Sequence, residues 1–195
     1  ARAKPCLFAG SSSAREQAVA CLAAAAWYEA GTDAGAQRSV MQVVLNRLNH
    51  PSFPKTVCGV VLQGSERRTG CQFTFTCDGS LDRRRPGPDS WTLARGRAEA
   101  ALSGAVDPSV LQATHYHADY VLPWWASQLE RLAKVGSHVF YRWPGSRGAL
   151  TGRPTAMPLA AASTLMIDAN GKFVGPASTG ADMALAAPRI ASAAV

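Results

Sequence analysis

The sequence lacks the run of about 18 or more apolar residues that a membrane-spanning helix requires, although hydrophobic residues make up 47% of the chain. We therefore expect no membrane span and a sizeable buried core. The sequence also lacks an HExxH motif and any CxxC pair, which are common ligand patterns of zinc and redox sites. We predict no bound metal and no other cofactor.

Acidic residues are scarce. Thirteen Asp and Glu against 20 Lys and Arg give a formal net charge of +7 and a pI of about 9.5. Such a surface attracts polyanions, including nucleic acid and acidic cell-wall polymers. The basic residues are dispersed, however, and the densest run, Arg83 to Arg85, leads into a loop-forming segment, Pro86 to Pro88. No nucleic-acid-binding motif accompanies it, so we expect no nucleic acid as a partner.

Cysteine is limited to five residues, an odd number that leaves at least one free thiol or an intermolecular link. Cys58, Cys71 and Cys77 fall in a loop-rich region, where a disulfide would stiffen a segment with little regular structure. We predict a bridge among these three and favour Cys71 to Cys77. For Cys21, which falls on a predicted helix, the alternative to pairing is a small buried hydrophobe. A disulfide indicates an oxidising compartment.

A length of 195 residues favours one main domain with an appendage. We expect residues 1–12 to form a short N-terminal leader and residues 13–143 to form the main domain. Residues 144–195 are predicted to be a Pro/Gly linker and an Ala-rich tail. Within the tail, residues 165–174 are predicted to form a hairpin that turns at Asn170-Gly171.

The main domain opens with a predicted helix from Ser13 to Ala30, which Gly31 ends. Ser13 and Glu16 have the spacing of a capping box, and apolar residues then follow the period of one buried face. Glu29 lies on the flank of that face near the helix C-terminus. Partial burial and the helix dipole both raise the pKa of a carboxyl there, as a general acid requires. The alternative is an ordinary solvated glutamate.

A second helix is predicted to begin near Thr32 or Asp33, which are both favourable caps. It is expected to end before residues 49–51, Asn-His-Pro, because proline disfavours helical backbone in the residue before it. Asn46 and Arg47 near its end are expected to anchor the helix pair internally.

Shorter elements follow. Residues 57–62, VCGVVL, are ambiguous between strand and helix. Residues 72–76, QFTFT, alternate polar and apolar side chains as a strand does, and Asp78-Gly79 then indicates a turn. The remaining predicted elements are a helix at 91–103 capped by Asp89-Ser90, and strands at 113–118 and 135–141.

Four stretches of the chain, taken together, resemble the SleB-type cell-wall hydrolases, the family that includes spore-cortex-lytic enzymes. In order they are AAWYEAGTDAGAQRSVMQVVLNRLNHPSFPKTVCGVVLQG, CQFTFTCDGS, ATHYHADYVLPWW and KVGSHVFYR. They cover about residues 18–142. The family usually carries an acidic residue shortly after the Glu-Ala segment, and Asp33 stands near that place.

The resemblance implies an α+β fold, a mainly helical, lysozyme-like domain with a small β element, in which residues 57–62 form a short helix. It implies that Glu29 is the catalytic residue. The implied substrate is the glycan strand of peptidoglycan, cut at the β-1,4 bond between muramic acid and glucosamine. The implied location is the periplasm or the cell exterior.

Glu29 is then predicted to protonate the leaving oxygen while an oxocarbenium-like centre forms on the muramic sugar. Relatives act as lytic transglycosylases, in which the sugar's own 6-hydroxyl attacks and leaves a 1,6-anhydro product; we expect this route. Lysozyme-type hydrolysis is the alternative and needs a second carboxylate. The candidates, none of which stands out, are Asp33, Asp78, Asp82, Asp89 and Asp119.

Further residues in the matching stretches are candidates for binding the glycan. They are Tyr28, Gln72, Phe73, Phe75, His115, Tyr116, His117 and Tyr141. Aromatic faces pack on sugar rings, and amides bond hydroxyls. The alternative for Phe73 and Phe75 is the hydrophobic core. His115 and His117 project from the same face of a strand, and their alternative is a structural role.

Two other classes of function remain open. His115, His117 and His138, with Glu29 as base, would suit a zinc hydrolase such as an amidase. A non-catalytic peptidoglycan-binding module is the second class. The sequence identifies no regulatory protein.

Overall fold

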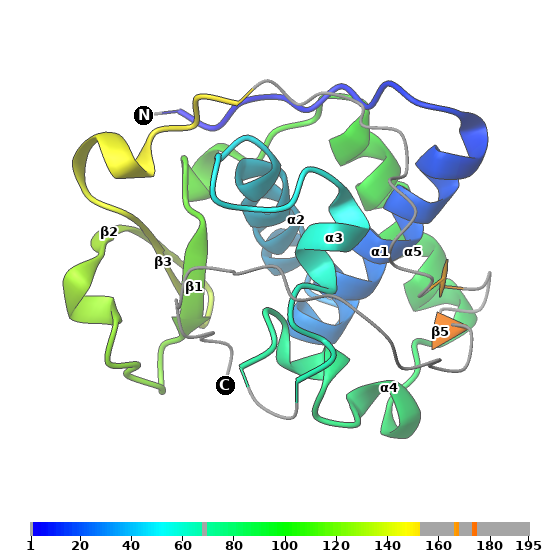
Figure 1. The fold of residues 1–195 in the computed structure, drawn as a ribbon. Helices are drawn as coiled ribbons and strands as arrows, with labels where there is room; N and C mark the ends of the chain where they lie inside the picture. The colour runs from blue at the N-terminus through cyan, green and yellow to red at the C-terminus, as the bar shows by residue number, and fades with distance from the viewer. Residues whose placement is uncertain (1, 68–69, 153–165, 168–172, 175–195) are drawn as a thin grey trace.

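The computed structural model describes residues 2–67, 70–152, 166–167 and 173–174. In this part of the chain the protein is a mainly helical α+β domain, with helices on one side and a small sheet on the other (Figure 1). The α-helices are α1 (Ser12–Ala30), α2 (Ala34–Leu48), α3 (Val57–Val61), α4 (Ser80–Arg83) and α5 (Pro88–Leu102). The strands are β1 (His115–Ala118), β2 (Glu130–Val135), β3 (His138–Arg142), β4 (Met166–Ile167) and β5 (Phe173–Val174).

Helix α1 is the central helix and packs against α2, α3 and α5. Every residue from Ala18 to Ala26 is buried, whereas the sequence pattern predicted burial of one face. A helix that is apolar on all sides is buried on all sides. The alanines make this packing feasible, because their small side chains let neighbouring helices approach closely.

The predicted C-terminal end of α1 is confirmed, but its predicted N-terminal cap is not. The capping box of Ser13 with Glu16 is not formed. Ser11 caps the helix instead, accepting the N–H three residues ahead at 3.2 Å, and Glu16 accepts a hydrogen bond from Arg95 at 2.6 Å. Gly31 ends the helix as predicted, with φ 55°, a conformation that glycine adopts without steric cost.

Helices α2 and α3 begin at side-chain caps. Asp33 accepts two backbone N–H groups at 2.8 and 2.9 Å, so its place after the Glu-Ala segment has a structural use. Helix α2 ends at Leu48, as predicted. Thr56 caps α3, and residues 57–61 are helical, as the family resemblance implied.

Two buried polar residues of α2 hold the chain that enters the sheet. The Asn46 amide donates to the carbonyl oxygens of Leu111 at 3.0 Å and Ala113 at 2.8 Å. The Arg47 Nε donates to the Thr114 carbonyl at 2.7 Å. They therefore join α2 to the start of β1, whereas the sequence predicted that they would anchor the helix pair.

Two disulfides cross the described structure. Cys71 and Cys77 are bridged, as predicted. Cys21 is bridged to Cys58, which excludes the alternative that it is an unpaired small hydrophobe. The packing of α1 on α3, which sequence neighbourhood does not reveal, brings the two residues to a Cα–Cα distance of 5.3 Å. Cys6 is a free, buried thiol.

The strand predicted for residues 72–76 does not form. Residues Thr74–Thr76 form a 3₁₀ turn instead. The flanking Cys71 and Cys77 have their Cα atoms 6.3 Å apart, whereas six residues of extended strand span about 20 Å. The predicted bridge and the predicted strand were therefore incompatible, and the bridge is present.

Helix α5 begins at Pro88, earlier than predicted. Gly87, rather than Asp89-Ser90, is its N-cap residue. Proline is favourable in the first turn, where its missing N–H would have no helical partner. The helix ends at Leu102, close to the predicted end at 103.

Residues near the N-terminus lie along the domain. The backbone N–H of Phe8 donates to the Leu102 carbonyl at 2.9 Å. Lys4 Nζ donates to the Leu150 carbonyl at 2.9 Å, and Cys6 is buried. This segment therefore lies against the C-terminal end of α5 and against the chain that follows β3.

The main sheet is antiparallel with strand order β1-β3-β2. Its strands β1 and β3 were predicted, with β3 entered through Gly136 at φ 54°. Strand β2 was not predicted, because ERLAKV alternates poorly. The β1–β3 register pairs Tyr116 with Phe140 and His117 with Val139.

Strands β4 and β5 pair antiparallel, with Met166 opposite Val174, as expected for the predicted hairpin. Its Asn170-Gly171 turn lies outside the described residues. The rest of residues 153–195 also lies outside them, and the domain boundary at 143 stays a prediction. Among the described residues, no helix combines the length and apolar character required to cross a membrane.

The two disulfides should differ in their effect on stability. The Cys21–Cys58 bridge spans 37 residues and Cys71–Cys77 spans 6. Loop-closure entropy predicts that Cys58→Ala lowers the free energy of unfolding by about 4 kcal/mol, and Cys77→Ala by about 2 kcal/mol. Urea unfolding without reductant measures both. A larger loss in Cys77→Ala than in Cys58→Ala would contradict this ordering.

Candidate active site

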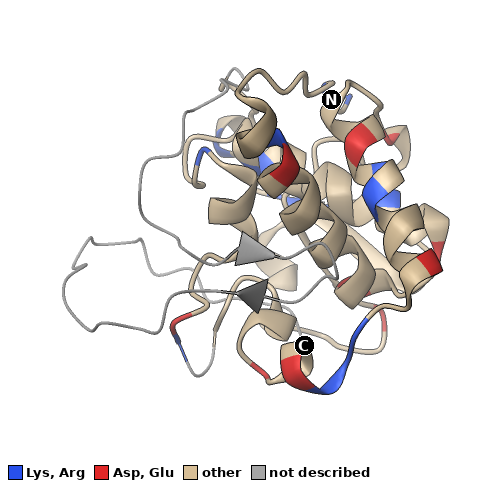
Figure 2. Ribbon diagram, turned by 90° about the vertical axis from the view of Figure 1, so that its right-hand side faces the viewer, with Lys and Arg blue, Asp and Glu red and all other residues tan. Residues whose placement is uncertain are grey.

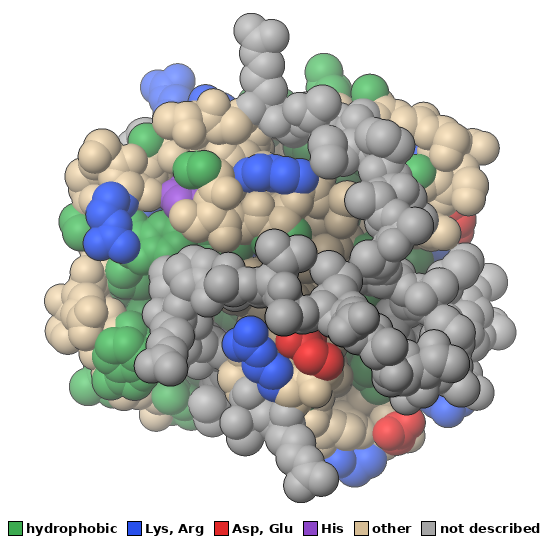
Figure 3. Space-filling model, in the orientation of Figure 1, with side chains coloured by type: hydrophobic (Ala, Val, Ile, Leu, Met, Phe, Trp, Pro, Cys, Tyr) green, Lys and Arg blue, Asp and Glu red, His purple; other side chains and the backbone are tan. Residues whose placement is uncertain are grey.

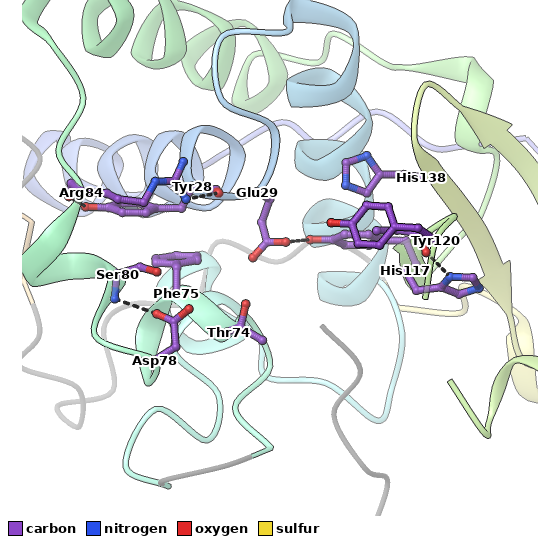
Figure 4. A pocket seen from close by; sticks show the side chains of 12 residues that line it. Tyr28, Glu29, Thr74, Phe75, Asp78, Ser80, Arg84, His117, Tyr120 and His138 are labelled. Atoms are coloured by element: carbon purple, nitrogen blue, oxygen red, sulfur yellow. Dashed lines mark hydrogen bonds between the residues drawn. The ribbon is translucent and has the colours of Figure 1, made fainter. Parts of the chain in front are cut away.

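A pocket of about 140 Å³ opens where the C-terminal end of α1 meets the 74–84 loop and the edge of the sheet. In Figure 4, Tyr28 and Arg84 lie on one side, Tyr120 and His138 on the other, and Glu29 points into the space between them. The residues that line the pocket are Tyr28, Glu29, Thr74, Phe75, Asp78, Ser80, Arg84, Tyr116, His117, Ala118, Tyr120 and His138.

Glu29 is placed by the last turn of α1, and its side chain is partly buried. The hydroxyl of Tyr116, on β1, donates a hydrogen bond to its Oε2 at 2.9 Å. This bond fixes one carboxyl oxygen and leaves the other facing the pocket (Figure 4). A helix end and a strand thus jointly orient the carboxyl.

Burial raises the pKa of Glu29 from 4.5 to about 7. The Tyr116 hydrogen bond and the positive charges of Arg47 and Arg84 lower it, while the negative charge of Asp78 raises it. Desolvation outweighs the opposing effects because it disfavours the charged form directly. Near neutral pH the carboxyl is therefore divided between its acid and base forms, the condition for general acid–base chemistry.

Tyr116 is a firmly held donor. Its side chain is buried, and its ring packs edge-on against His138 at 5.4 Å and tilted against Phe140 at 5.7 Å. Burial, together with the nearby Glu29, holds the pKa of Tyr116 well above its usual value of 10. The phenol therefore keeps its proton and donates to Glu29 throughout the physiological pH range.

An aromatic and cationic wall faces Tyr116 across the pocket. The ring of Tyr28 stacks on Phe75 with centroids 4.7 Å apart and planes 6° from parallel. The Tyr28 hydroxyl donates to the Arg84 carbonyl at 2.8 Å. The Arg84 guanidinium lies 5.3 Å from the ring centre of Trp27 and 5.8 Å from that of Tyr28, which is within the range of a cation–π contact.

Arg84 belongs to the basic run at 83–85, which begins at the last residue of α4. Elsewhere Lys and Arg are spread over the structure (Figure 2). The run was predicted to be a loop; Arg83 is instead the last residue of α4, and residues 84–87 lie outside any helix or strand. The densest basic segment of the sequence therefore adjoins the pocket.

Of the acidic candidates for a second carboxylate, the structure brings Asp78 into the pocket. Its Oδ1 accepts the Ser80 N–H at 2.7 Å. Gly79 takes the left-handed conformation at φ 79°, so the predicted Asp-Gly turn forms and places the carboxylate at the rim. Asp78 is solvent-exposed, in contrast to Glu29.

The other candidates lie outside the pocket lining. Asp33 caps α2, and Asp119 pairs with Lys134 at 2.8 Å. Asp82 is in α4 and Asp89 is in the first turn of α5.

Gln72 and Phe73, which were predicted to bind substrate, lie behind the pocket around Arg47. Phe73 is fully buried. The Arg47 guanidinium lies 5.3 Å from the ring centres of Phe53 and Phe73. With the Gln72 amide turned so that its oxygen faces Arg47, that oxygen accepts two hydrogen bonds at 2.9 and 3.0 Å. Burial lowers the pKa of Arg47 to about 10, so it stays positively charged at neutral pH.

The histidine pair of β1, His115 and His117, faces a second aromatic layer, which is formed by Trp125, Tyr141 and Trp143. The imidazole Nε2 of His117 is 2.9 Å from the Tyr141 hydroxyl, and both residues are buried. His115 contacts Trp143 and Trp125 with ring centres 4.6 and 5.8 Å apart, and burial lowers its pKa to about 3. His117 reaches the pocket lining, while His115 and Tyr141 do not.

The geometry does not gather the ligands of the alternative zinc site. His138 packs on Tyr116, whereas His115 packs on Trp143 in the second aromatic layer. Among the residues that the structure describes, no group of three or more His, Cys, Asp or Glu is placed to hold a metal ion.

Several lining residues were not among the predicted substrate-binding residues: Thr74, Asp78, Ser80, Arg84, Ala118, Tyr120 and His138. Most of them lie within or beside the stretches that carried the family resemblance. Their position within or beside these stretches was therefore the available signal in the sequence that they belong to the pocket. Tyr28, Phe75, Tyr116 and His117 are the predicted binding residues that line the pocket with Glu29.

The fold is that of a lysozyme-like cell-wall hydrolase domain. A family model described as Cell Wall Hydrolase matches residues 31–141, more than half of the chain, and the chain belongs to this family. The match begins just after Glu29, in the cap of α1.

Curated relatives of the chain are spore cortex-lytic enzymes. It is 32% identical over 104 residues to that of Halalkalibacterium halodurans and 28% identical over 107 residues to that of Oceanobacillus iheyensis. Each alignment covers 53% of this chain, but 28% and 33% of the respective relatives. The matched part thus spans about a third of their length.

Two solved structures share the fold. One is the catalytic domain of the Bacillus cereus SleB protein, with TM-score 0.51 and 25% identity, over 70% of this chain and 95% of the other. The second is the catalytic domain of the germination-specific lytic transglycosylase SleB from Bacillus anthracis. Its TM-score is 0.51 and its identity 27%, over 68% of this chain and 98% of the other.

The raised pKa of Glu29 predicts a pH-dependent effect of Glu29→Gln on stability. The folded chain keeps the proton up to about pH 7, while the unfolded chain releases it near pH 4.5. Wild-type stability therefore falls as the pH rises through this range, by up to about 3 kcal/mol. Since glutamine does not titrate, the stability of Glu29→Gln relative to wild type should rise by that amount between pH 5 and pH 8.

Urea unfolding at pH 5 and pH 8 measures this difference. Glu99→Gln, at an exposed position of α5, is the matched control and should follow the wild type. If the difference in free energy of unfolding between Glu29→Gln and wild type were the same at both pH values, Glu29 would have an ordinary pKa.

Proposed function

We propose that this chain cleaves the glycan strand of peptidoglycan at the β-1,4 bond between muramic acid and glucosamine, with Glu29 as general acid and base. The observation that carries this proposal is the partly buried Glu29 carboxyl, whose pKa is about 7 and which Tyr116 orients into an open pocket. Membership of the Cell Wall Hydrolase family supports the substrate class.

In the proposed reaction, protonated Glu29 donates its proton to the glycosidic oxygen as the bond from that oxygen to C1 of the muramic sugar breaks. The glucosamine leaves as an alcohol, and positive charge develops on C1. The 6-hydroxyl of the same sugar then attacks C1 and gives its proton to the Glu29 carboxylate. The product is a 1,6-anhydro sugar, and Glu29 is protonated again for the next cycle.

The surroundings of Glu29 support both halves of this cycle. Burial keeps the carboxyl protonated before the first step. After it has lost its proton, the Tyr116 hydrogen bond and the charges of Arg47 and Arg84 stabilise the carboxylate. Preorganised donors and charges of this kind act without reorganisation during the reaction.

Hydrolysis of the same bond is the second candidate, and Asp78 is the observation that favours it. The two carboxyls occupy contrasting environments, since Glu29 is partly buried and Asp78 is exposed at the rim. Such a contrast separates an acid from an ionised partner in glycosidases. In this route Asp78 would activate water or stabilise the charge on C1, and the product would have a reducing end.

We place this activity outside the cytoplasm, in the periplasm or the cell exterior. The two disulfides support that location, since such bridges persist in oxidising compartments. Peptidoglycan is the partner in this proposal.

Digestion of purified peptidoglycan, with products identified by mass spectrometry, tests the proposal. Wild-type protein should release anhydromuropeptides. Glu29→Gln should lower the rate at least about 100-fold, the contribution typical of general acid–base catalysis. Equal rates in the two proteins would contradict a role for Glu29. Binding without product in either protein would indicate a non-catalytic module.

Asp78→Asn separates the two candidate reactions, with Asp82→Asn, an exposed acid of α4, as its matched control. In transglycosylation, both variants should still release anhydro products. Reducing-end products from the wild type that disappear in Asp78→Asn but persist in Asp82→Asn would establish hydrolysis instead.

A further inference from the structure

Exposed large hydrophobic side chains are concentrated on one short loop. Among the described residues, three of the six such side chains lie within five positions of each other. They are Tyr120, Leu122 and Trp124, with 82%, 88% and 64% of their surface exposed. In Figure 3, hydrophobic side chains gather on the surface at the end of the molecule that holds the sheet. Clustered exposed apolar groups mark binding surfaces more often than single ones do.

The loop is held firmly at its start, where the chain leaves β1. The Asp119 N–H donates to the Ser137 carbonyl at 2.7 Å, and the Val121 N–H donates to the Ala118 carbonyl at 2.9 Å. The Asp119 carboxylate also pairs with Lys134 at 2.8 Å. Its backbone is therefore tied to β1 and to the β2–β3 turn while the three apolar side chains face solvent.

The neighbouring tryptophan anchors the loop from below. Trp125 is buried, and its ring centre lies 5.8 Å from that of His115, 5.7 Å from His117 and 5.6 Å from Tyr141. These three contacts give the second aromatic layer a structural role. It secures the loop on the sheet, so that Trp124 is presented outward by a fixed backbone.

The loop is continuous with the candidate active site. Ala118 and Tyr120 both line the pocket, and Leu122 and Trp124 follow Tyr120 at alternate positions along the chain. A pocket of about 140 Å³ accommodates only a small part of a polysaccharide. The rest of a bound strand must cross the surface beside the pocket.

Resting on the proposed function, we infer that Tyr120, Leu122 and Trp124 form a glycan platform that binds sugar units of the peptidoglycan strand next to the cleaved bond. The flat C–H faces of the sugars would pack on the two aromatic rings and on Leu122. The phenol and indole groups each combine an apolar ring with a hydrogen-bonding group, which suits a substrate that alternates apolar faces with hydroxyls.

The charge of the loop favours a glycan over a membrane surface. Residues 118–129, ADYVLPWWASQL, contain no Lys or Arg, and their single charge is Asp119. Segments that bind anionic lipid surfaces combine their apolar residues with basic ones. The basic run of this chain lies at 83–85, on the opposite side of Glu29 from Tyr120 (Figure 4).

Co-sedimentation with insoluble peptidoglycan tests the platform without digestion if the full chain carries Glu29→Gln. Adding Tyr120→Ala and Trp124→Ala should weaken binding at least about fivefold, as expected when buried aromatic contacts are truncated. Leu7→Ala with Leu93→Ala, which removes two exposed apolar side chains elsewhere, is the matched control and should bind normally. Trp124→Phe should restore most of the affinity lost in Trp124→Ala.

Leu122→Ala with Trp124→Ala, two platform residues outside the pocket lining, gives a second measurement in the otherwise wild-type chain. The KM for long glycan strands should rise, while kcat and the products stay unchanged. Unchanged affinity and unchanged KM would overturn the platform while leaving the proposed function intact. The platform would also be overturned if its substitutions reduced binding to phosphatidylglycerol vesicles but not to peptidoglycan. A changed oligomeric state with normal peptidoglycan binding would overturn it as well. No peptidoglycan binding by the Glu29→Gln chain and no product from the wild type would overturn the proposed function itself.

Discussion

The hydrogen bond from Tyr116 to Glu29 is the contact on which the site depends, because it joins the two layers of the fold at the pocket. Glu29 comes from the last turn of the central helix, and Tyr116 from β1. For the two groups to meet, the start of β1 must be fixed relative to the helices. The buried Asn46 and Arg47 do this by binding the carbonyls of the chain that enters β1. These buried polar side chains of α2 therefore help to fix the geometry of the site.

The electrostatics of the pocket balance desolvation against nearby cations. Burial favours the neutral form of Glu29, while Arg47 and Arg84 favour the charged form. Either influence alone would give a carboxyl fixed in one state at neutral pH; together they bring its pKa to about 7. Arg47 is held behind the pocket between two phenylalanine rings, and Arg84 lies across the aromatic wall. The aromatic residues therefore hold the cations at a distance from which they tune Glu29 without forming an ion pair that would trap its charge.

Local patterns predicted the helices well and the loops poorly. Periodicity and Gly31 located α1, the Asp33 cap helped to locate α2, and the resemblance identified α3 as a helix and Glu29 as the candidate acid. The partner of Glu29 is 87 residues away in sequence, so no local pattern could pair them. The Cys21–Cys58 bridge depends in the same way on helix packing. QFTFT alternates like a strand, but the bridge across it excludes an extended chain. Asp78 could not be separated from four other acids until the loop brought it to the pocket.

The central claim is that Glu29 is half protonated near neutral pH, and its direct titration is the sharpest test. Carbon-13 NMR of glutamate side-chain carboxyls in the full chain would follow its ionisation, with Glu29→Gln identifying the signal by its absence. The account predicts a midpoint near pH 7, because burial raises the pKa from 4.5 to about 7. A midpoint near 4.5 would mean that the carboxyl is solvated and fully ionised at neutral pH. The pocket would then hold no general acid at Glu29.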